Sequence, residues 1–515
     1  MIQYNDIWYT IGGKMFSISE LLPNQEDPST PLHLIESYNG HQLFCNPWGA
    51  GSRIALQAAI DLADKKALRA SQPALTLDQG IKVIEALHET LEYEVAQGPD
   101  SEFLQTYIRF KGVPISEILE DIKALRSLLH DFQGEQLQLK AMLGTDSPAQ
   151  FFATHTVIPK FGIMASGNLG LFETILLIWS AILAQAAKNG NQFSLLVKPS
   201  MYDCLFHEMI HWLPEHVRSA FSRITWRSDQ DITPDADLIG EFINKADGAI
   251  YFGNKNTLDQ LKIHLVNESH HHYFYSDHFP IMLVFPDMDT PMLQAAAKQA
   301  VSLAFRRRGE ACLSLQDVFA HEKVYERFMY FVAQEWQLLK QTTTDPLMPE
   351  TQLANYSTSH LAEMEQLRQK LNGNVMGEVF PQAFRTDLLV NYNVAVDDWV
   401  LSTENAAPLL CVASFTDSDQ LLFALQSHIQ NSTSDKFIYA AIVGSTSEKS
   451  VASIGEVLSS ISHRIEWLTS VDGIQDFVTY YPGVPHCSSI SFLADMFGLP
   501  HQSDCYWGYW GGSKK

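Results

Sequence analysis

The residues with the clearest chemical potential are a cysteine and the basic run just before it. The segment from Phe305 to Cys312 reads FRRRGEAC. A helix rich in alanine and valine runs into the glycine, and a strand from Asp317 to Ala320 follows. A cysteine on such a turn can be exposed, and arginines beside it would stabilise the thiolate, which is the nucleophilic form. The segment alone is compatible with a nucleophile at Cys312 but does not favour one. The alternative is a buried structural cysteine beside a solvated basic run.

His207, Glu208 and His211 form an H-E-x-x-H pattern, the zinc-binding signature of many metallopeptidases. On a helix, two histidines four residues apart share one face and could chelate zinc, with Glu208 as the base. The alternative is a plain helix that covers a sheet, because this segment follows a predicted strand ending near Lys198. We favour the plain helix and expect no metal, and a zinc metallohydrolase stays as a third functional hypothesis.

The elements that must position these residues alternate between strand and helix. Short apolar runs predict strands at 161–165, 194–197, 248–252, 281–285, near 318, and at 388–396, 409–415 and 437–443. Between them we expect helices at 202–221, 295–305 and 325–337, and a polar stretch at 342–372. Strands separated by helices imply parallel sheets covered on both faces. Ligands bind at the carboxyl ends of such strands, so the turns after Ala165, Val197 and Phe252 are the candidate binding regions.

Two amphipathic helices precede the alternating region. Thr76 and Gln79 form a capping box at the start of the first, and apolar residues at helical spacing mark the second from Ile115 to Leu129. The last forty residues are aromatic and rich in glycine, with little helical period. The predicted fold class is therefore α/β, with two lobes and a C-terminal appendage.

The segment around Cys312 resembles the nucleophile segment of the aldehyde dehydrogenase superfamily. That family carries Phe-x-x-x-Gly-Gln-x-Cys, whose cysteine is the nucleophile. This chain keeps Phe305, Gly309 and Cys312 and has Glu310 where glutamine is usual. The resemblance covers most of the chain, and it depends on the order and spacing of several short segments rather than on any single one.

Four further segments are similar to the family's site segments. Ser166 and Asn168 lie where the family has Pro-Trp-Asn, whose asparagine helps to form the oxyanion hole. Lys198 begins a turn like the one that binds the adenosine ribose, and Gly253 lies in a turn like the one near the pyrophosphate. Glu404 corresponds to the glutamate that holds the nicotinamide ribose. The resemblance thus implies that Ser166, Lys198, Gly253 and Glu404 bind NAD or NADP.

The resemblance also implies a domain organisation. Residues 1–280 would form N-terminal helices and a Rossmann-type cofactor lobe, with an oligomerisation β-excursion near 138–160. Residues 281–475 would form the α/β catalytic lobe that carries Cys312, and residues 476–515 a C-terminal oligomerisation segment. The aromatic run that begins at Tyr506 suits a subunit contact. We therefore expect a homodimer or homotetramer.

Departures from the family pattern affect the predicted reaction. The usual general-base glutamate falls at Phe274, which cannot activate water to hydrolyse a thioester. Met201 stands where an acidic residue that repels a 2′-phosphate often follows Lys-Pro-Ser, so the choice between NAD and NADP stays open. The second glycine of the pyrophosphate turn is absent, which predicts altered or weaker cofactor binding. We expect transfer of the acyl group to a thiol such as coenzyme A, or the reverse reduction. Glu310 as a substitute base is the alternative.

The predicted function is that of an NAD(P)-dependent oxidoreductase acting on an aldehyde or acyl substrate. Cys312 would attack the carbonyl, and Asn168 with the Cys312 backbone N–H would stabilise the oxyanion. Hydride would move between this adduct and the nicotinamide, which leaves a thioester. The alternative is a catalytically inactive subunit of the same fold that serves in binding or assembly.

Composition excludes several other classes of protein. The 515 residues include 59 acidic and 35 basic side chains, a formal net charge of −24, which argues against nucleic-acid and anionic-membrane partners. The start of the chain lacks a signal-peptide pattern, and the longest apolar stretch, 175–187, is shorter than the roughly 20 residues that span a bilayer. Six cysteines without a C-x-x-C pair suggest reduced thiols. We therefore expect a cytoplasmic protein.

Overall fold

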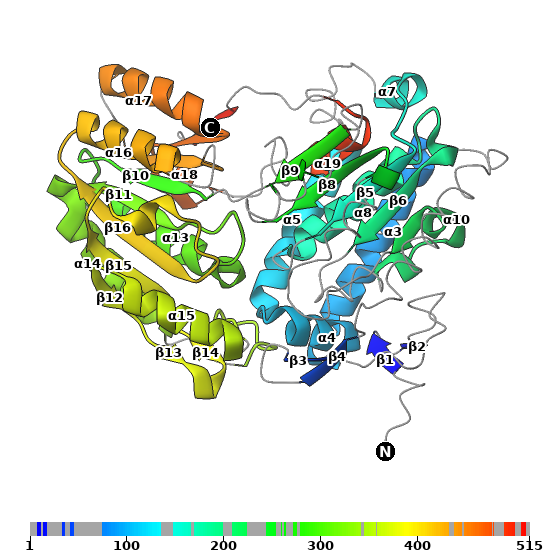
Figure 1. Ribbon diagram of the computed structural model, residues 1–515, viewed down its shortest axis with the longest axis horizontal. Helices are drawn as coiled ribbons and strands as arrows, with labels where there is room; N and C mark the ends of the chain where they lie inside the picture. The colour runs from blue at the N-terminus through cyan, green and yellow to red at the C-terminus, as the bar shows by residue number, and fades with distance from the viewer. Residues whose placement is uncertain are drawn as a thin grey trace.

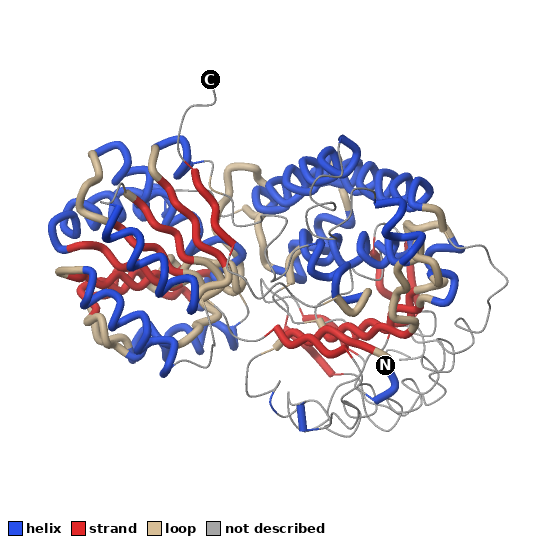
Figure 2. Tube along the Cα trace, turned by 90° about the horizontal axis from the view of Figure 1, so that it is seen from above, coloured by secondary structure: helices blue, strands red, loops and turns tan. Residues whose placement is uncertain are grey.

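The computed structural model has two α/β lobes side by side, joined through the middle of the chain (Figures 1 and 2). It describes residues 8–11, 14–17, 33–36, 42–45, 75–134, 148–165, 169–198, 209–223, 244–253, 259, 262–263, 271–275, 279–340, 345–356, 358–431, 437–444, 448–475, 477, 489–499 and 506–510. The predicted α/β fold is confirmed. Within these ranges, no helix is both long enough and apolar enough to cross a bilayer.

The N-terminal lobe packs helices on a five-stranded parallel sheet of order β7-β6-β5-β8-β9. The strands are β5 (Lys160–Met164), β6 (Ser194–Lys198), β7 (Phe221–Arg223), β8 (Gly248–Phe252) and β9 (His271–Tyr275). The helices are α3 (Leu77–Ala96), α4 (Glu102–Lys111), α5 (Ile115–Gly134), α7 (Pro148–Thr154), α8 (Leu171–Ala184) and α10 (Glu215–Arg218), with short 3-10 turns η3 (Gly98–Asp100) and η4 (Gly190–Gln192). Two hairpins, β1 (Trp8–Ile11) with β2 (Lys14–Ser17) and β3 (His33–Glu36) with β4 (Gln42–Cys45), precede them.

The core of this lobe forms around α8, whose fourteen residues are all buried. A helix that is apolar on every side needs neighbours on every side. Helices α3 and α5 pack against it, and so does α19 (Ser489–Met496) from near the C-terminus. The capping box predicted at Thr76 and Gln79 is confirmed at the start of α3.

The second lobe is built on an eight-stranded sheet of order β12-β15-β16-β11-β10-β17-β18-β19, parallel except at the β12 edge. The strands are β10 (Ile281–Val284), β11 (Asp317–His321), β12 (Asn374–Met376), β15 (Leu389–Val394), β16 (Leu409–Phe415), β17 (Ala440–Val443), β18 (Arg464–Leu468) and β19 (Tyr506–Trp510), beside a small β13 (Val379–Phe380) and β14 (Arg385–Thr386) hairpin. The helices are α13 (Thr290–Phe305), α14 (Glu322–Lys340), α15 (Thr358–Lys370), α16 (Ser418–Asn431), α17 (Glu448–Ile461) and α18 (Val471–Gln475), with 3-10 turns η5 (Arg306–Gly309), η6 (Pro381–Ala383) and η7 (Trp399–Ser402).

The side chains of successive β10 residues point to opposite faces of this sheet, because side chains alternate along a strand. Met282 and Val284 pack in the cluster with α13 and α14, whereas Ile281 and Leu283 pack in the cluster with α16 and α17. The sheet is therefore covered on both faces, as its continuous apolar strands predicted.

Several local predictions are wrong. The helix predicted to reach residue 221 is interrupted at Pro214, which has no N–H to continue a helix, and Phe221 begins β7. Residues 148–154 of the predicted β-excursion form α7. The polar stretch at 342–372, for which no element was predicted, contains α15.

The C-terminal residues described, α19 and β19, belong to the two lobes of this chain rather than to a separate appendage. Helix α19 joins the core around α8, and β19 pairs with β18 at the edge of the eight-stranded sheet. Subunit contacts through residues 476–515 stay a prediction.

Candidate active site

The turn η5 carries Cys312 to the boundary between the lobes. Three successive residues, Arg307, Arg308 and Gly309, have φ of 52°, 64° and 68°. Left-handed backbone is unfavourable for residues with a Cβ, so surrounding contacts must hold this turn. Beyond it, the partly exposed Cys312 packs against the apolar cores of both lobes.

Cys312 and Glu404, two predicted site residues more than ninety positions apart in sequence, line one cavity of about 230 Å³. The other residues of its wall are Phe279, Gly309, Ala311, Ser314, Leu315, Gln316, Asn405, Ala407 and Leu409. A thiol and a carboxylate on one cavity wall are the groups that the resemblance assigns to nucleophilic attack and to ribose binding.

Gly309 permits the close contact between the Cys312 turn and the segment that carries Glu404. A Cβ on Gly309 would lie 2.4 Å from the Ala407 carbonyl oxygen and from Pro408 Cα. Both contacts are with backbone, which cannot rotate away. Any side chain at this position must therefore push the Glu404 segment from the Cys312 turn.

We expect Gly309→Ala to lower kcat/KM about 100-fold, because a displacement near 1 Å at a reacting centre has an effect of that size. Gly98→Ala is the matched control. Gly98 also has a positive φ, of 56°, but nothing lies within 4 Å of its Cβ position. This control carries the backbone strain, roughly 1–2 kcal/mol, without the collision. Steady-state kinetics of both variants checks the prediction, and equal activities would contradict it.

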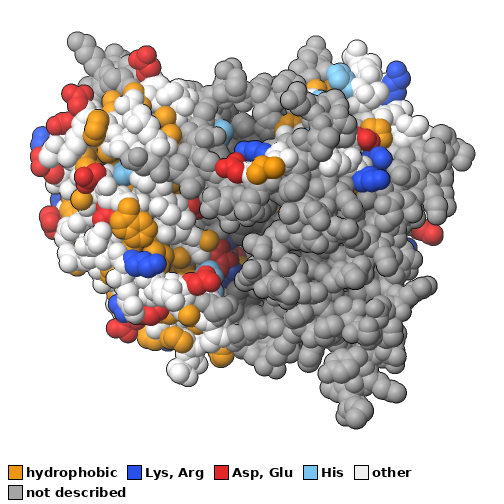
Figure 3. Space-filling model, viewed as in Figure 1, with side chains coloured by type: hydrophobic (Ala, Val, Ile, Leu, Met, Phe, Trp, Pro, Cys, Tyr) orange, Lys and Arg blue, Asp and Glu red, His pale blue; other side chains and the backbone are white. Residues whose placement is uncertain are grey.

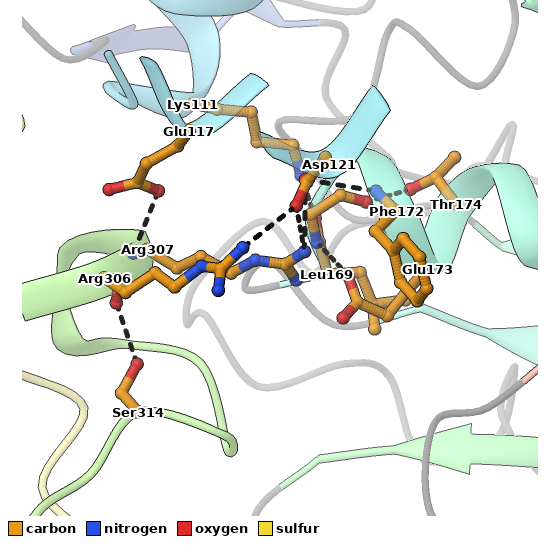
Figure 4. Close-up of polar contacts among 11 residues, drawn as sticks. Lys111, Glu117, Asp121, Leu169, Phe172, Glu173, Thr174, Arg306, Arg307 and Ser314 are labelled. Carbon is orange, nitrogen blue, oxygen red and sulfur yellow. Dashed lines mark hydrogen bonds and ion pairs between the residues drawn. The ribbon is translucent and has the colours of Figure 1, made fainter. Parts of the chain in front are cut away.

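Two of the three arginines before Cys312, Arg306 and Arg307, pair with carboxylates of the N-terminal lobe and so join the two lobes (Figure 4). The buried Arg307 guanidinium donates to both Asp121 carboxylate oxygens, at 3.0 and 3.1 Å, and pairs with Glu173. Arg306 lies 3.1 Å from Glu120, and Arg308 pairs with Glu310. The left-handed turn directs these side chains toward the N-terminal lobe.

Backbone groups complete this contact between the lobes. The Arg307 N–H donates to Glu117 across the boundary at 2.9 Å, and within the N-terminal lobe the Gly170 N–H donates to Glu173 at 3.0 Å. A Cβ on Gly170 would lie 2.6 Å from Arg307 Nη1, so a side chain at this position would displace the guanidinium. Sequence reasoning missed this network. One signal for it was Glu173, a lone carboxylate in an otherwise apolar helix.

A second cavity, of about 410 Å³, lies on the other side of the turn, between the lobes. It is lined by Tyr107, Lys111, Val113, Glu117, Ile118, Asp121, Leu169, Gly170, Arg307, Arg308 and Glu310. Charged side chains gather along this boundary on the face that Figure 3 shows. Burial raises the pKa of Glu117 to about 7, and the nearby Arg306 and Arg307 charges oppose that shift.

Glu310, the predicted substitute base, lines this second cavity rather than the cavity that contains Cys312. Its carboxylate pairs with Arg308 and lies 3.2 Å from His360 Nε2. Burial, followed by the Arg308 charge, lowers the pKa of His360 to about 4, so this histidine is neutral at pH 7.

Two of the predicted cofactor residues, Lys198 and Gly253, lie at the carboxyl ends of strands in the N-terminal sheet. Lys198 ends β6, and Gly253 directly follows β8. Strands β5 and β8 are the neighbours at which the strand order reverses, which is where dinucleotides bind in sheets of this kind. Ser166 and Asn168, which follow β5, lie outside the described residues. Phe274 lies in β9, paired with Tyr251.

Only part of the H-E-x-x-H pattern can be located, because His207 and Glu208 lie outside the described residues. His211 Nδ1 lies 3.2 Å from the Arg218 guanidinium. No group of three or more residues that could hold a metal ion occurs in the part of the chain that the structure describes.

Comparisons with known proteins agree with this architecture. Residues 281–434 match the model of the aldehyde dehydrogenase family. A comparison with curated proteins finds no match. The chain is similar to a solved NAD-dependent benzaldehyde dehydrogenase from Corynebacterium glutamicum, with 16% identity, a TM-score of 0.62, and coverage of 90% of this chain and 95% of that one. It is also similar to a mutant aldehyde dehydrogenase C from Pseudomonas syringae in complex with NAD+ and octanal, with 14% identity, a TM-score of 0.66, and coverage of 94% and 91%. At these identities, the similarity to solved structures shows a shared fold.

Proposed function

Since the chain has the aldehyde dehydrogenase fold and, through residues 281–434, belongs to the aldehyde dehydrogenase superfamily, we propose that it is an NAD(P)-dependent oxidoreductase of aldehydes that works through Cys312. The observation that carries the proposal is the cavity that Cys312 and Glu404 share, where Cys312 also packs against the cores of both lobes. Nothing in the sequence around Cys312 indicates that Glu404 lies near it, and only the fold brings the two residues together.

The Cys312 thiolate adds to the aldehyde carbonyl, which forms a carbon–sulfur bond and places negative charge on the oxygen. The Cys312 backbone N–H and the Asn168 side chain stabilise this oxyanion. When bound, a nicotinamide cofactor supplies the hydride acceptor for oxidation of the adduct. Oxidation leaves an acyl thioester on Cys312.

Features of this chain fit NAD or NADP as the cofactor. The reversal of strand order at β5 and β8 provides the crevice, with Gly253 directly after β8 allowing close approach of a phosphate. Ser166 and Lys198 would hold the cofactor at the ends of β5 and β6. The Glu404 carboxylate can accept hydrogen bonds from ribose hydroxyls.

The thioester on Cys312 is released by transfer to a thiol such as coenzyme A. The new thiolate attacks the acyl carbon, and Cys312 leaves as a thiolate. Two observations support transfer over hydrolysis. Phe274 occupies the position of the usual base in the sequence, and the Glu310 carboxylate is paired with Arg308 on the second cavity.

The experiment is product analysis with the wild-type protein, an aldehyde series and each nicotinamide cofactor, with and without coenzyme A. We expect cofactor reduction that depends on the thiol and yields the acyl thioester. Rapid formation of free acid without a thiol would exclude transfer and favour Glu310 as the base. Failure to bind either cofactor would exclude the oxidoreductase and favour an inactive binding or assembly subunit.

The same relationship supports a homodimer or homotetramer in the cytoplasm. The acidic composition, with 59 acidic against 35 basic residues, suits a soluble small-molecule enzyme that contacts neither nucleic acid nor an anionic membrane.

A further inference from the structure

Glu404 lies on a short segment without regular structure. The segment joins η7, which ends at Ser402, to β16, which begins at Leu409. Thr403 is exposed and Glu404 is half-buried. Irregular backbone with few bonds to rigid elements opens readily, so hydrogen bonds from such an element help to fix the backbone on either side of Glu404.

The Gln316 side chain supplies such bonds on both sides of Glu404. Its Nε2 donates to the Thr403 carbonyl at 2.5 Å, and its Oε1 accepts from the Asn405 N–H at 2.8 Å. The other hydrogen bonds described for Thr403 and Asn405 are local, with partners between Trp399 and Ala407. One amide therefore bridges the residues that flank Glu404.

Gln316 is itself rigidly held. It is only 4% exposed and directly precedes β11 in the middle of the sheet. Its backbone carbonyl accepts from the Cys411 N–H at 2.8 Å. Gln316 follows Cys312 by four residues and lines the same cavity. Its hydrogen bonds to the Glu404 segment therefore hold Glu404 at a defined position relative to the Cys312 thiol.

The ends of the segment are anchored separately. At one end, Ser402 Oγ lies 2.5 Å from Nδ1 of the buried His428. At the other end, the backbone at Ala407 and Pro408 packs closely against Gly309. Between these anchors, Gln316 supplies two hydrogen bonds from a rigid element to the backbone of the segment.

We propose that Gln316 is a positioning residue, which fixes Glu404 over the cavity through its two hydrogen bonds to Thr403 and Asn405. The inference rests on the proposed function, in which Glu404 binds the nicotinamide ribose. It predicts that the loss of the Gln316 amide weakens cofactor binding through displacement of Glu404.

The first test is Gln316→Met, which keeps the length of the side chain and removes both hydrogen bonds. We expect the Kd for the nicotinamide cofactor, measured by fluorescence titration, to rise about tenfold, with the KM for the aldehyde unchanged. Gln334→Met is the matched control, because Gln334 lies on the exposed face of α14 and bonds only its helix neighbour Tyr330 in the described structure. An unchanged cofactor Kd in the Gln316 variant would overturn the proposal.

A second variant, Gln316→Glu, keeps the test decisive if the methionine variant does not fold. A neutral carboxylic acid can donate to the Thr403 carbonyl and accept from the Asn405 N–H, whereas the carboxylate has no donor. The ratio of cofactor Kd in this variant to that in the wild type should fall toward one between pH 8 and pH 6. A ratio that is constant and close to one over this range would overturn the proposal.

Glu404→Gln separates failure of this inference from failure of the proposed function. If Glu404→Gln weakens cofactor binding and the Gln316 variants do not, Gln316 has no positioning role and the proposed function stands. If Glu404→Gln has no effect on cofactor binding, the assignment of Glu404 fails and the inference fails with it.

Discussion

Replacing Cys312 by alanine is expected to lower aldehyde-dependent cofactor reduction by at least about 10⁴-fold, which is the scale seen when a covalent nucleophile is removed. Cys312 is the thiol that lines the cavity shared with Glu404. Alanine removes the sulfur and adds no bulk, so the cofactor Kd should stay within about twofold of the wild-type value. The measurement combines steady-state kinetics with cofactor titration.

Cys411 provides the matched control. It is fully buried in β16, and burial raises the pKa of its thiol, so it should react slowly with electrophiles. Brief alkylation at pH 7 followed by peptide mass spectrometry should modify Cys312 and leave Cys411 unmodified. Cys411→Ala should keep wild-type activity. Retained activity in Cys312→Ala, or an inert Cys312 thiol, would remove the nucleophile from the proposed mechanism.

Arg307→Met is expected to destabilise the fold by roughly 3–5 kcal/mol, because removing one partner of a buried ion pair leaves the other charge uncompensated. The Arg307 side chain is 7% exposed, and its partners Asp121 and Glu173 are 5% and 3% exposed. Methionine retains much of the apolar volume of the arginine side chain. The measured decrease in the free energy of unfolding therefore comes mainly from the loss of the guanidinium charge. Chemical denaturation monitored by circular dichroism gives the free energy of unfolding.

Arg126→Met is the control for this change. Its side chain is 67% exposed and its guanidinium pairs with Glu92, and a pair so open to solvent contributes about 0–1 kcal/mol. Similar losses of stability in the two variants would contradict a special role for Arg307.

The effect of Arg307→Met should also depend on pH. Asp121 and Glu173 are left without their cation, and Glu117, whose folded pKa of about 7 exceeds its ordinary value of 4.5, lies beside them. A carboxyl whose pKa is raised by folding stabilises the fold when protonated, and that stability is lost as pH rises from the unfolded toward the folded pKa. The stability difference between wild type and variant should therefore be larger at pH 8 than at pH 5.

The sequence alone determined most elements of the fold. The capping box at Thr76 and the buried strands β5, β8 and β16 can be predicted from short segments of the sequence. Periodicity and capping depend only on residues within a few positions of one another. The resemblance around Cys312 also depends on a contiguous segment. These features require no knowledge of how distant parts of the chain meet.

Only the tertiary structure decided what surrounds Cys312. Arg307 meets Asp121 across 186 positions of sequence and Glu173 across 134, and nothing local shows which carboxylates a run of three arginines will find. The packing of α5 and α8 against the turn selects these partners and supports its left-handed backbone. The bridge from Gln316 to the Glu404 segment spans almost ninety positions and forms because β11 and β16 are neighbours in one sheet.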